Sequence, residues 1–172
     1  MIWHGWPEDR RYSTLEGTRE LIGLYNASGK FANDNGLRFG LHNHWWEFRN
    51  KVAGKYVYEI LLEELDPDIF FEIDTYWVKV AGHDPAKIVR AFGNKVKSMH
   101  VKDGPALYND RLAIDNPDPM TPVGKGSQDF PSIFNAAAGS CEWLIIEMDK
   151  TATDVFDALE ESIRYMKPYI VQ

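Results

Sequence analysis

The segment IFFEID, residues 69–74, is a short apolar run that carries two carboxylates near its end. Its length and its bulky apolar side chains predict a buried strand. Asp84-Pro85 follows and predicts a helix that runs to about Phe92, because proline is favoured at the first helical position. The segment VKSMHV, residues 96–101, then predicts a second strand. This succession of strand, helix and strand decides the fold.

The same alternation extends over the whole chain. Parallel strands joined by right-handed crossovers, with helices outside, are the expected result, and both a doubly wound sheet and a (β/α) barrel fit it. No Gly-x-Gly-x-x-Gly opens a helix after a strand, which counts against a dinucleotide-binding fold. The further strands are expected at 1–6, 37–44 and 143–148, and the further helices at 13–35, with Ser13 as N-cap, and at 57–65, 130–138 and 153–167.

The composition narrows the class of protein. The chain has 172 residues, a formal net charge of −7 and one cysteine, Cys141. We expect a single domain over residues 1–172. The acidic balance argues against a nucleic-acid partner, and no apolar run approaches the roughly 20 residues of a membrane span. A single cysteine and the absence of a signal-peptide pattern lead us to expect a cytoplasmic protein without a membrane partner.

One long segment has no periodicity. Residues 102–127 are polar and rich in proline and glycine, and they follow directly after a predicted strand. A stretch of this length inside a compact domain is usually a functional loop. We expect it to form a mobile cover over a pocket.

Polar side chains gather at the predicted carboxyl ends of the strands, where parallel α/β folds bind their ligands. A single carboxylate there is usually a helix cap, and a single histidine is usually a core residue. Their recurrence on four successive strands favours a divalent-metal site, because uncompensated buried charge is costly. Nitrogen and oxygen donors suit Mn, Co, Mg, Zn or Fe ions. The residues are His4, His42, His44, Glu72, Asp74, His100, Lys102, Asp103, Glu147 and Asp149.

Five blocks of the chain resemble a known family. They are GLHNHWWEF (40–48), FFEIDTYWVKVAGHDPAKIV (70–89), VKSMHVKDG (96–104), PVGKGSQDF (122–130) and WLIIEMD (143–149). In this order they are similar to the sugar phosphate isomerase/epimerase family, the xylose isomerase-like barrels. The resemblance implies a partial (β/α) TIM barrel of about five βα units, which corresponds to the carboxyl-terminal portion of the barrel and lacks the first three units.

The resemblance also implies one divalent metal ion at the carboxyl face, held by one residue from each of four strands. By position, Asp74, His100 and Glu147 match three of those ligands. Members of the family usually have a glutamate where this chain has His42, which we expect to be the fourth ligand, with His44 as the alternative. The implied reaction is isomerisation or epimerisation of a sugar, sugar phosphate or inositol-like polyol by proton transfer next to a carbonyl, and dehydration shares the same first step.

Roles follow for further residues. Glu147 is the first candidate for the base, and His44 or Glu47 can act from the other side of the substrate, although Glu47 fits a loop salt bridge equally well. A non-catalytic truncated barrel is the main alternative, and an abasic-site endonuclease is disfavoured by the acidic balance and the few histidines. Trp46 and Trp77 suit stacking on a sugar or covering of the loop's own core. The candidates for substrate binding are Lys102, Trp46, Trp77, His4 and Lys125.

Five strands cannot close a barrel that needs eight. The segments IWHGW (2–6) and WLIIEM (143–148) are then open edges with unpaired backbone groups. We expect a homo-oligomer, most simply a dimer, or a fragment whose parent supplies the missing strands.

Overall fold

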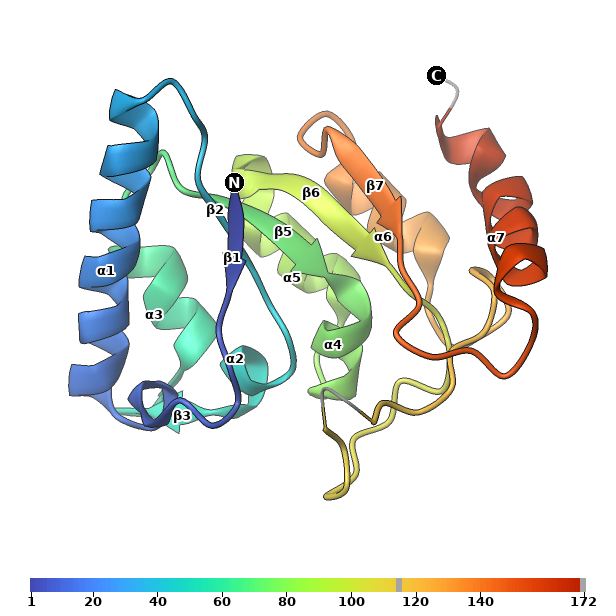
Figure 1. The fold of residues 1–172 in the computed structure, drawn as a ribbon, viewed down its shortest axis with the longest axis horizontal. Coiled ribbons are helices and arrows are strands. Elements are labelled where there is room, and N and C mark those ends of the chain that lie inside the picture. Colours follow the sequence, from blue (N-terminus) through green and yellow to red (C-terminus); the bar gives the residue numbers. More distant parts are fainter. Residues whose placement is uncertain (114–115, 171–172) are drawn as a thin grey trace.

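The computed structural model describes residues 1–113 and 116–170, and its centre is a sheet of five parallel strands (Figure 1). The strands lie in the order β1-β2-β5-β6-β7, and each pairs in parallel with its neighbour. The predicted partial barrel of xylose isomerase-like type is therefore confirmed in its strand number and direction. The strands are β1 (Ile2–His4), β2 (Gly40–His42), β5 (Phe70–Asp74), β6 (Val96–Val101) and β7 (Trp143–Ile146).

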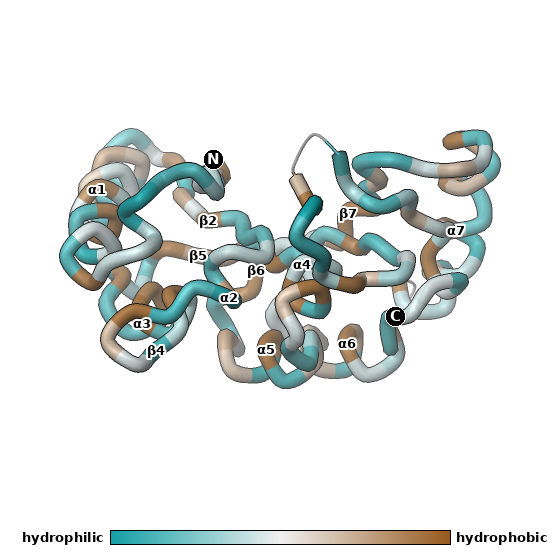
Figure 2. The backbone as a smooth tube through the Cα atoms, turned by 90° about the horizontal axis from the view of Figure 1, so that it is seen from below, coloured by the Kyte–Doolittle hydropathy of each residue, from teal (hydrophilic) through white to brown (hydrophobic). Residues whose placement is uncertain are grey.

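The helices form an arc along one face of the sheet (Figure 2). Apolar side chains of the strands, such as Leu41, Phe71, Ile73 and Met99, are buried on this face and form the core. Burial of this apolar surface is the main stabilising contribution to the fold. The helices are α1 (Leu15–Asp34), α2 (Trp46–Arg49), α3 (Val57–Glu64), α4 (Thr75–Val80), α5 (Pro85–Phe92), α6 (Phe130–Ala137) and α7 (Val155–Ile170).

The start of α1 differs from the prediction. Ser13 belongs to a short 3-10 helix, Arg10–Ser13, and Thr14 is the N-cap of α1. The Thr14 hydroxyl accepts the backbone N–H of Gly17 at 3.0 Å, which satisfies one of the free amide groups at the helix start. Ser13 was the wrong choice because two adjacent hydroxyl residues both suit a cap, and the preceding 3-10 turn decides between them.

Several short elements were not predicted. The loop after α2 contains an antiparallel hairpin of β3 (Lys51–Val52) and β4 (Lys55–Tyr56). The four-residue α2 and the six-residue α4 begin immediately after the ends of β2 and β5. Both helices are too short for a periodic apolar pattern, so no helical signal marks them in the sequence.

The inner face of the sheet, which a closed barrel would cover, is partly open. Trp143 is 69% exposed, Ile2 is 41% exposed and Ile145 is 38% exposed. Strands β1 and β7 are the two edges of the sheet, as predicted from the sequence. Among the described residues, no helix has the length and apolar character needed to cross a membrane.

The segment 102–127 is fixed at both ends by Asp103. The Asp103 carboxylate accepts the backbone N–H groups of Gly104, Gly124, Gly126 and Gln128 at 2.9 to 3.1 Å. The side chains of Met120 and Val123 are also buried. The prediction of a mobile cover is therefore wrong for the two ends of this segment. Mobility stays a prediction for the middle of the segment, of which residues 114 and 115 lie outside the described residues.

Candidate metal centre

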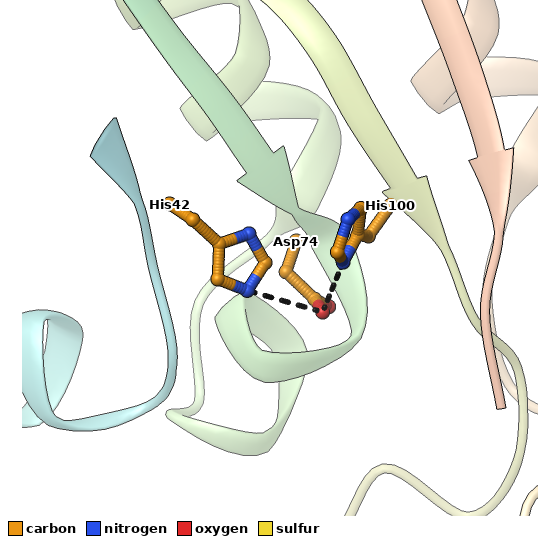
Figure 3. Close-up of side chains that lie close together, drawn as sticks. All are labelled: His42, Asp74 and His100. Carbon is orange, nitrogen blue, oxygen red and sulfur yellow. Dashed lines mark ion pairs between the residues drawn. The ribbon is translucent and has the colours of Figure 1, made fainter. Parts of the chain in front are cut away.

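Three predicted ligands meet at the carboxyl edge of the sheet. His42 comes from the end of β2, Asp74 from the end of β5 and His100 from β6 (Figure 3). Each offers one ligand atom, and these atoms all lie within 4.8 Å of one another. Asp74 Oδ2 is 4.0 Å from His42 Nε2 and 3.6 Å from His100 Nδ1. Three donors about 2.1 Å from one ion lie roughly 3–4 Å apart, so the triad has the dimensions of a metal site.

The local structure aims Asp74 at the histidines. Asp74 is the N-cap of α4, and its Oδ1 accepts the backbone N–H groups of Tyr76 at 3.0 Å and Trp77 at 3.2 Å. Asn43 fixes the backbone of the same residue, because its side-chain amide accepts the Asp74 N–H at 2.9 Å and donates to the Asp74 carbonyl at 3.2 Å. The second carboxylate oxygen, Oδ2, is left to face the cluster.

Glu147 and Lys102 extend the cluster toward β7. Glu147 Oε2 contacts His100 Nδ1 and lies 2.8 Å from Lys102 Nζ. The Lys102 ammonium also lies 3.0 Å from Asp74 Oδ2 and 2.8 Å from Asp149 Oδ2. Asp74 and Glu147 therefore lie on the same side of the sheet, as a shared site requires. Lys102 is only 2% exposed, so its charge depends on these carboxylates.

Glu72 also belongs to the cluster. The sequence places it among the polar residues of the third predicted strand and indicates no role for it. Its side chain is buried, and Oε1 lies 3.3 Å from His42 Nδ1 and 3.1 Å from His100 Nε2. The signal was its position two residues before Asp74, which places both carboxylates on one face of β5.

The surrounding charges shift the pKa values of these groups. Burial raises the pKa of Asp74, but Lys102 and the two histidines outweigh burial and hold it well below its ordinary value. Burial likewise raises the pKa of Glu147, and His100 and Lys102 lower it to about 2. Burial lowers the pKa of His100, whereas the carboxylates beside it raise it to about 11. The cluster therefore favours positive charge at its centre.

The donor set fits a divalent cation. Asp74 Oδ2, Glu147 Oε2 and His100 Nδ1 are buried, and among the described residues they have ion-pair contacts but no hydrogen bond. Buried polar atoms without partners are costly, and a bound ion would satisfy those that point into the cluster. Among the described residues, the Lys102 ammonium and the protonated His100 ring oppose the four carboxylates of Glu72, Asp74, Glu147 and Asp149. A divalent ion at the triad would replace the His100 proton and supply this positive charge itself.

Aromatic rings surround the histidines. The His44 ring stacks on Trp46 with centroids 4.4 Å apart, and it meets the His42 ring edge-on at 5.0 Å. Trp77 lies on a further side of His44, at 6.0 Å, and His4 lies 5.4 Å from the same ring. Trp46 and Trp77 are 3% and 2% exposed. Burial lowers the pKa of His44 to about 3, so this ring is neutral at physiological pH.

Two other candidates have different surroundings. Glu47 is buried, and its carboxylate accepts the backbone N–H of His44 at 3.1 Å. Burial raises the pKa of Glu47 to about 8. The structure does not bring Lys125 to the cluster, because its Nζ pairs with Glu161 of α7 at 3.1 Å. The backbone N–H groups of Gly124 and Gly126, on either side of Lys125, donate to the Asp103 carboxylate.

Comparisons with known proteins identify the family of this fold. A family model described as a xylose isomerase-like TIM barrel matches residues 1–169. An inosose dehydratase from Clostridium tetani (strain Massachusetts / E88) is 26% identical to this chain in an alignment of 157 residues, and the match covers 83% of this chain and 51% of that protein.

Solved structures share the fold. A sugar phosphate isomerase/epimerase from Parabacteroides distasonis ATCC 8503 has a TM-score of 0.81 at 23% identity, over 99% of this chain and 58% of its own. A crystal structure of the IOLI protein with a bound zinc atom has a TM-score of 0.66 at 13% identity, over 91% of this chain and 59% of its own. The chain thus spans little more than half the length of these proteins.

Proposed function

We propose that this chain, which belongs to the xylose isomerase-like TIM barrel family, binds one divalent metal ion and moves a proton next to the carbonyl of a sugar, sugar phosphate or polyol. Isomerisation, epimerisation and dehydration all begin with this step. The observation that carries the proposal is the convergence of His42, Asp74 and His100 at the carboxyl edge of the sheet.

The proposed ligands are His42, Asp74, His100 and Glu147. When bound, Mn²⁺, Co²⁺, Mg²⁺, Zn²⁺ or Fe²⁺ acts as a Lewis acid that polarises the carbonyl and acidifies the neighbouring C–H bond. The IOLI protein, which shares this fold, has a bound zinc atom in its crystal structure. His42 is preferred over His44 because its Nε2 faces Asp74, whereas the His44 ring is stacked on Trp46.

Glu147 is the proposed base. Its side chain is 37% exposed, so a substrate can reach it, and its low pKa keeps it ionised at neutral pH. The carboxylate takes the proton from the carbon next to the carbonyl, the C–H electrons form a carbon–carbon double bond, and the π electrons of the carbonyl move to its oxygen to give an enediolate. Lys102 is proposed to stabilise the negative charge on that oxygen, because its ammonium is a buried cation beside the proposed base, 2.8 Å from Glu147 Oε2.

Returning the proton to the other face of the substrate needs a second group. His44 or Glu47 is proposed for this role, and Glu47, with a pKa near 8, carries a proton at neutral pH. Trp46, Trp77 and His4 are proposed to line the substrate site, because their rings surround His44. A substrate-binding role of Lys125 remains a prediction that needs its ion pair with Glu161 to open.

One observation favours a second candidate function. Within the described residues the sheet is open at β1 and β7, and the chain spans 58% of the length of a solved structure with the same fold. A chain that binds metal or sugar without turnover, or that only associates, is the alternative.

Metal titration is the first test. Adding Mn²⁺ should raise the melting temperature, because an ion that binds only the folded state stabilises it by mass action. His100→Ala should abolish this shift. Lys97→Met on the same strand should keep it, since Lys97 pairs with Glu142 away from the triad. An unchanged melting temperature of the wild type at millimolar metal would refute the metal site.

Solvent exchange tests the chemistry separately. The metal-loaded protein is incubated in D₂O with a panel of ketoses, aldoses, their phosphates and inosose-like ketones, and deuterium next to each carbonyl is followed by NMR. Exchange that disappears in Glu147→Gln supports proton transfer regardless of the final product. Metal binding without exchange of any panel member would favour the non-catalytic alternative.

A further inference from the structure

Each histidine of the triad has a second ring nitrogen, and both of these nitrogens face the same carboxylate oxygen. Glu72 Oε1 lies 3.3 Å from His42 Nδ1 and 3.1 Å from His100 Nε2. The nitrogens that face Asp74 are the opposite ones, His42 Nε2 and His100 Nδ1 (Figure 3). Glu72 therefore touches the far side of each ring as seen from Asp74.

The Glu72 carboxylate is itself held in place. Its second oxygen, Oε2, accepts a hydrogen bond from the Ser98 hydroxyl at 2.7 Å. Glu72 and Ser98 are register partners on neighbouring strands β5 and β6, so the sheet fixes this contact. The residue is 4% exposed, and water therefore competes little for its oxygens.

We propose that Glu72 is a positioning residue for both histidine ligands, with Oε1 accepting the N–H of His42 Nδ1 and of His100 Nε2. An imidazole that holds a metal ion is neutral and carries one proton, so fixing this proton on one nitrogen leaves the lone pair of the other nitrogen for the ion. In both rings this second nitrogen is the one that faces Asp74. The inference rests on the proposed function, because the rings need this orientation only if the triad holds a cation.

A purely structural role explains Glu72 poorly. Burying a carboxylate within a strand is costly unless enough partners compensate it. Asp103 shows what a structural carboxylate of this fold looks like, because it accepts four backbone N–H groups. The one hydrogen bond that Glu72 accepts within the described residues comes from Ser98, and its other close contacts are the two rings.

Zinc affinity, measured by calorimetry, provides the first readout. Glu72→Gln keeps the size of the side chain but replaces one accepting oxygen with an N–H₂ group, which cannot accept from the histidine rings or from Ser98. This change should weaken zinc binding about 10- to 100-fold. Ser98→Ala keeps the charge and releases Oε2, and it should cause a smaller loss. Asp149→Asn is the matched control, since it removes one charge from the same cluster but contacts Lys102 rather than a ring.

Histidine side-chain ¹⁵N spectra of the zinc-loaded protein provide the second readout, which a change in fold stability alone would not move. The wild type should show His42 protonated at Nδ1 and His100 protonated at Nε2, and Glu72→Gln should shift or broaden both signals. If Glu72→Gln does not fold, Ser98→Ala decides: weaker zinc binding with altered ring signals supports the role, and unchanged affinity with unchanged signals overturns it.

The outcomes separate the two levels of inference. A wild-type protein that does not bind zinc overturns the proposed function and, with it, the role of Glu72. A wild type that binds zinc, with Glu72→Gln equal to it in affinity and ring signals, overturns the role of Glu72 alone. A loss in Asp149→Asn as large as in Glu72→Gln would also overturn it, because charge rather than positioning would then explain the effect.

Discussion

At the scale of single residues, buried ionisable side chains next to the triad make the stability of the fold depend on pH. Glu47 is the clearest, because burial raises its pKa to about 8 from the ordinary value of 4.5. The folded state then binds more protons than the unfolded state between these two pH values. The free energy of unfolding therefore decreases as pH rises from 4.5 to about 8, and Glu47 causes no further change above this range.

Glu47→Gln should remove this dependence while its amide oxygen still accepts the His44 N–H. The difference in unfolding free energy between variant and wild type should grow between pH 5 and 8, by at most about 1.4 kcal/mol per pH unit. Urea unfolding at several pH values measures it, with the exposed Glu8→Gln as control. A difference that is constant across this range would mean that Glu47 is ionised in the folded protein.

Lys102 competes with a metal ion for the same oxygens. Its ammonium lies 3.0 Å from Asp74 Oδ2 and 2.8 Å from Glu147 Oε2. Lys102→Met should destabilise the metal-free protein by about 3–5 kcal/mol, because it leaves buried carboxylates unpaired. Added Mn²⁺ should then raise the melting temperature of the variant by more than that of the wild type. Lys97→Met is the control, and equal shifts in Lys102→Met and wild type would contradict this competition.

The candidate site could be predicted in part from single residues. Alternation along the strands correctly grouped His42, Asp74 and His100, because parallel strands present their carboxyl ends at one edge. The contacts of Glu72 with both rings could not be predicted, since they depend on the register of β5 against its neighbours. The ion pair of Lys125 could not be predicted either, because nothing in the sequence indicates that α7 lies beside the turn that contains Lys125.

At the scale of elements, Asp103 is the anchor of the long segment after β6. Oδ1 accepts the N–H groups of Gly104 and Gln128, and Oδ2 accepts those of Gly124 and Gly126. Gly126 has to be a glycine here, because a Cβ would lie 2.2 Å from Asp103 Oδ1. The two ends of the segment are thereby joined at one carboxylate.

Asp103→Asn should release this turn, because its amide N–H₂ group would face two backbone N–H groups. Each buried donor left without a partner costs about 1–3 kcal/mol. Hydrogen exchange at the amides of Gly124 and Gly126 should accelerate strongly, whereas Asp110→Asn in the exposed part of the segment should leave it unchanged. Protection equal to that of the wild type would show that other contacts hold the turn.

The elements themselves were largely predictable. The five strands and five longer helices follow from apolar periodicity and from capping signals such as Asp84-Pro85. The shift of the α1 cap from Ser13 to Thr14, and the very short α2, α4 and β3–β4 hairpin, depend on packing that no short pattern encodes.

At the scale of the whole molecule, the open sheet is the dominant feature. Strands β1 and β7 have no partner on their outer sides within the described residues, and apolar side chains of the inner face remain exposed. Exposed strand edges and apolar patches favour association. The homo-oligomer, most simply a dimer, therefore remains our prediction.

Ile145→Lys tests the contribution of this face, because Ile145 is 38% exposed on β7. In an oligomer, the buried charge should shift the protein toward monomers or unfold it, and sedimentation velocity measures the change. Arg90→Glu on the exposed side of α5 should leave the oligomer intact. A wild type that sediments as a single monomeric species at high concentration would contradict the association prediction.

The central claim is that His42, Asp74 and His100, together with Glu147, hold one divalent ion. Anomalous diffraction from crystals grown with Mn²⁺ or Zn²⁺ tests it most directly. The account predicts a single strong peak about 2.0–2.3 Å from His42 Nε2, Asp74 Oδ2 and His100 Nδ1. A map without a peak among these atoms, in crystals saturated with the metal, would contradict it.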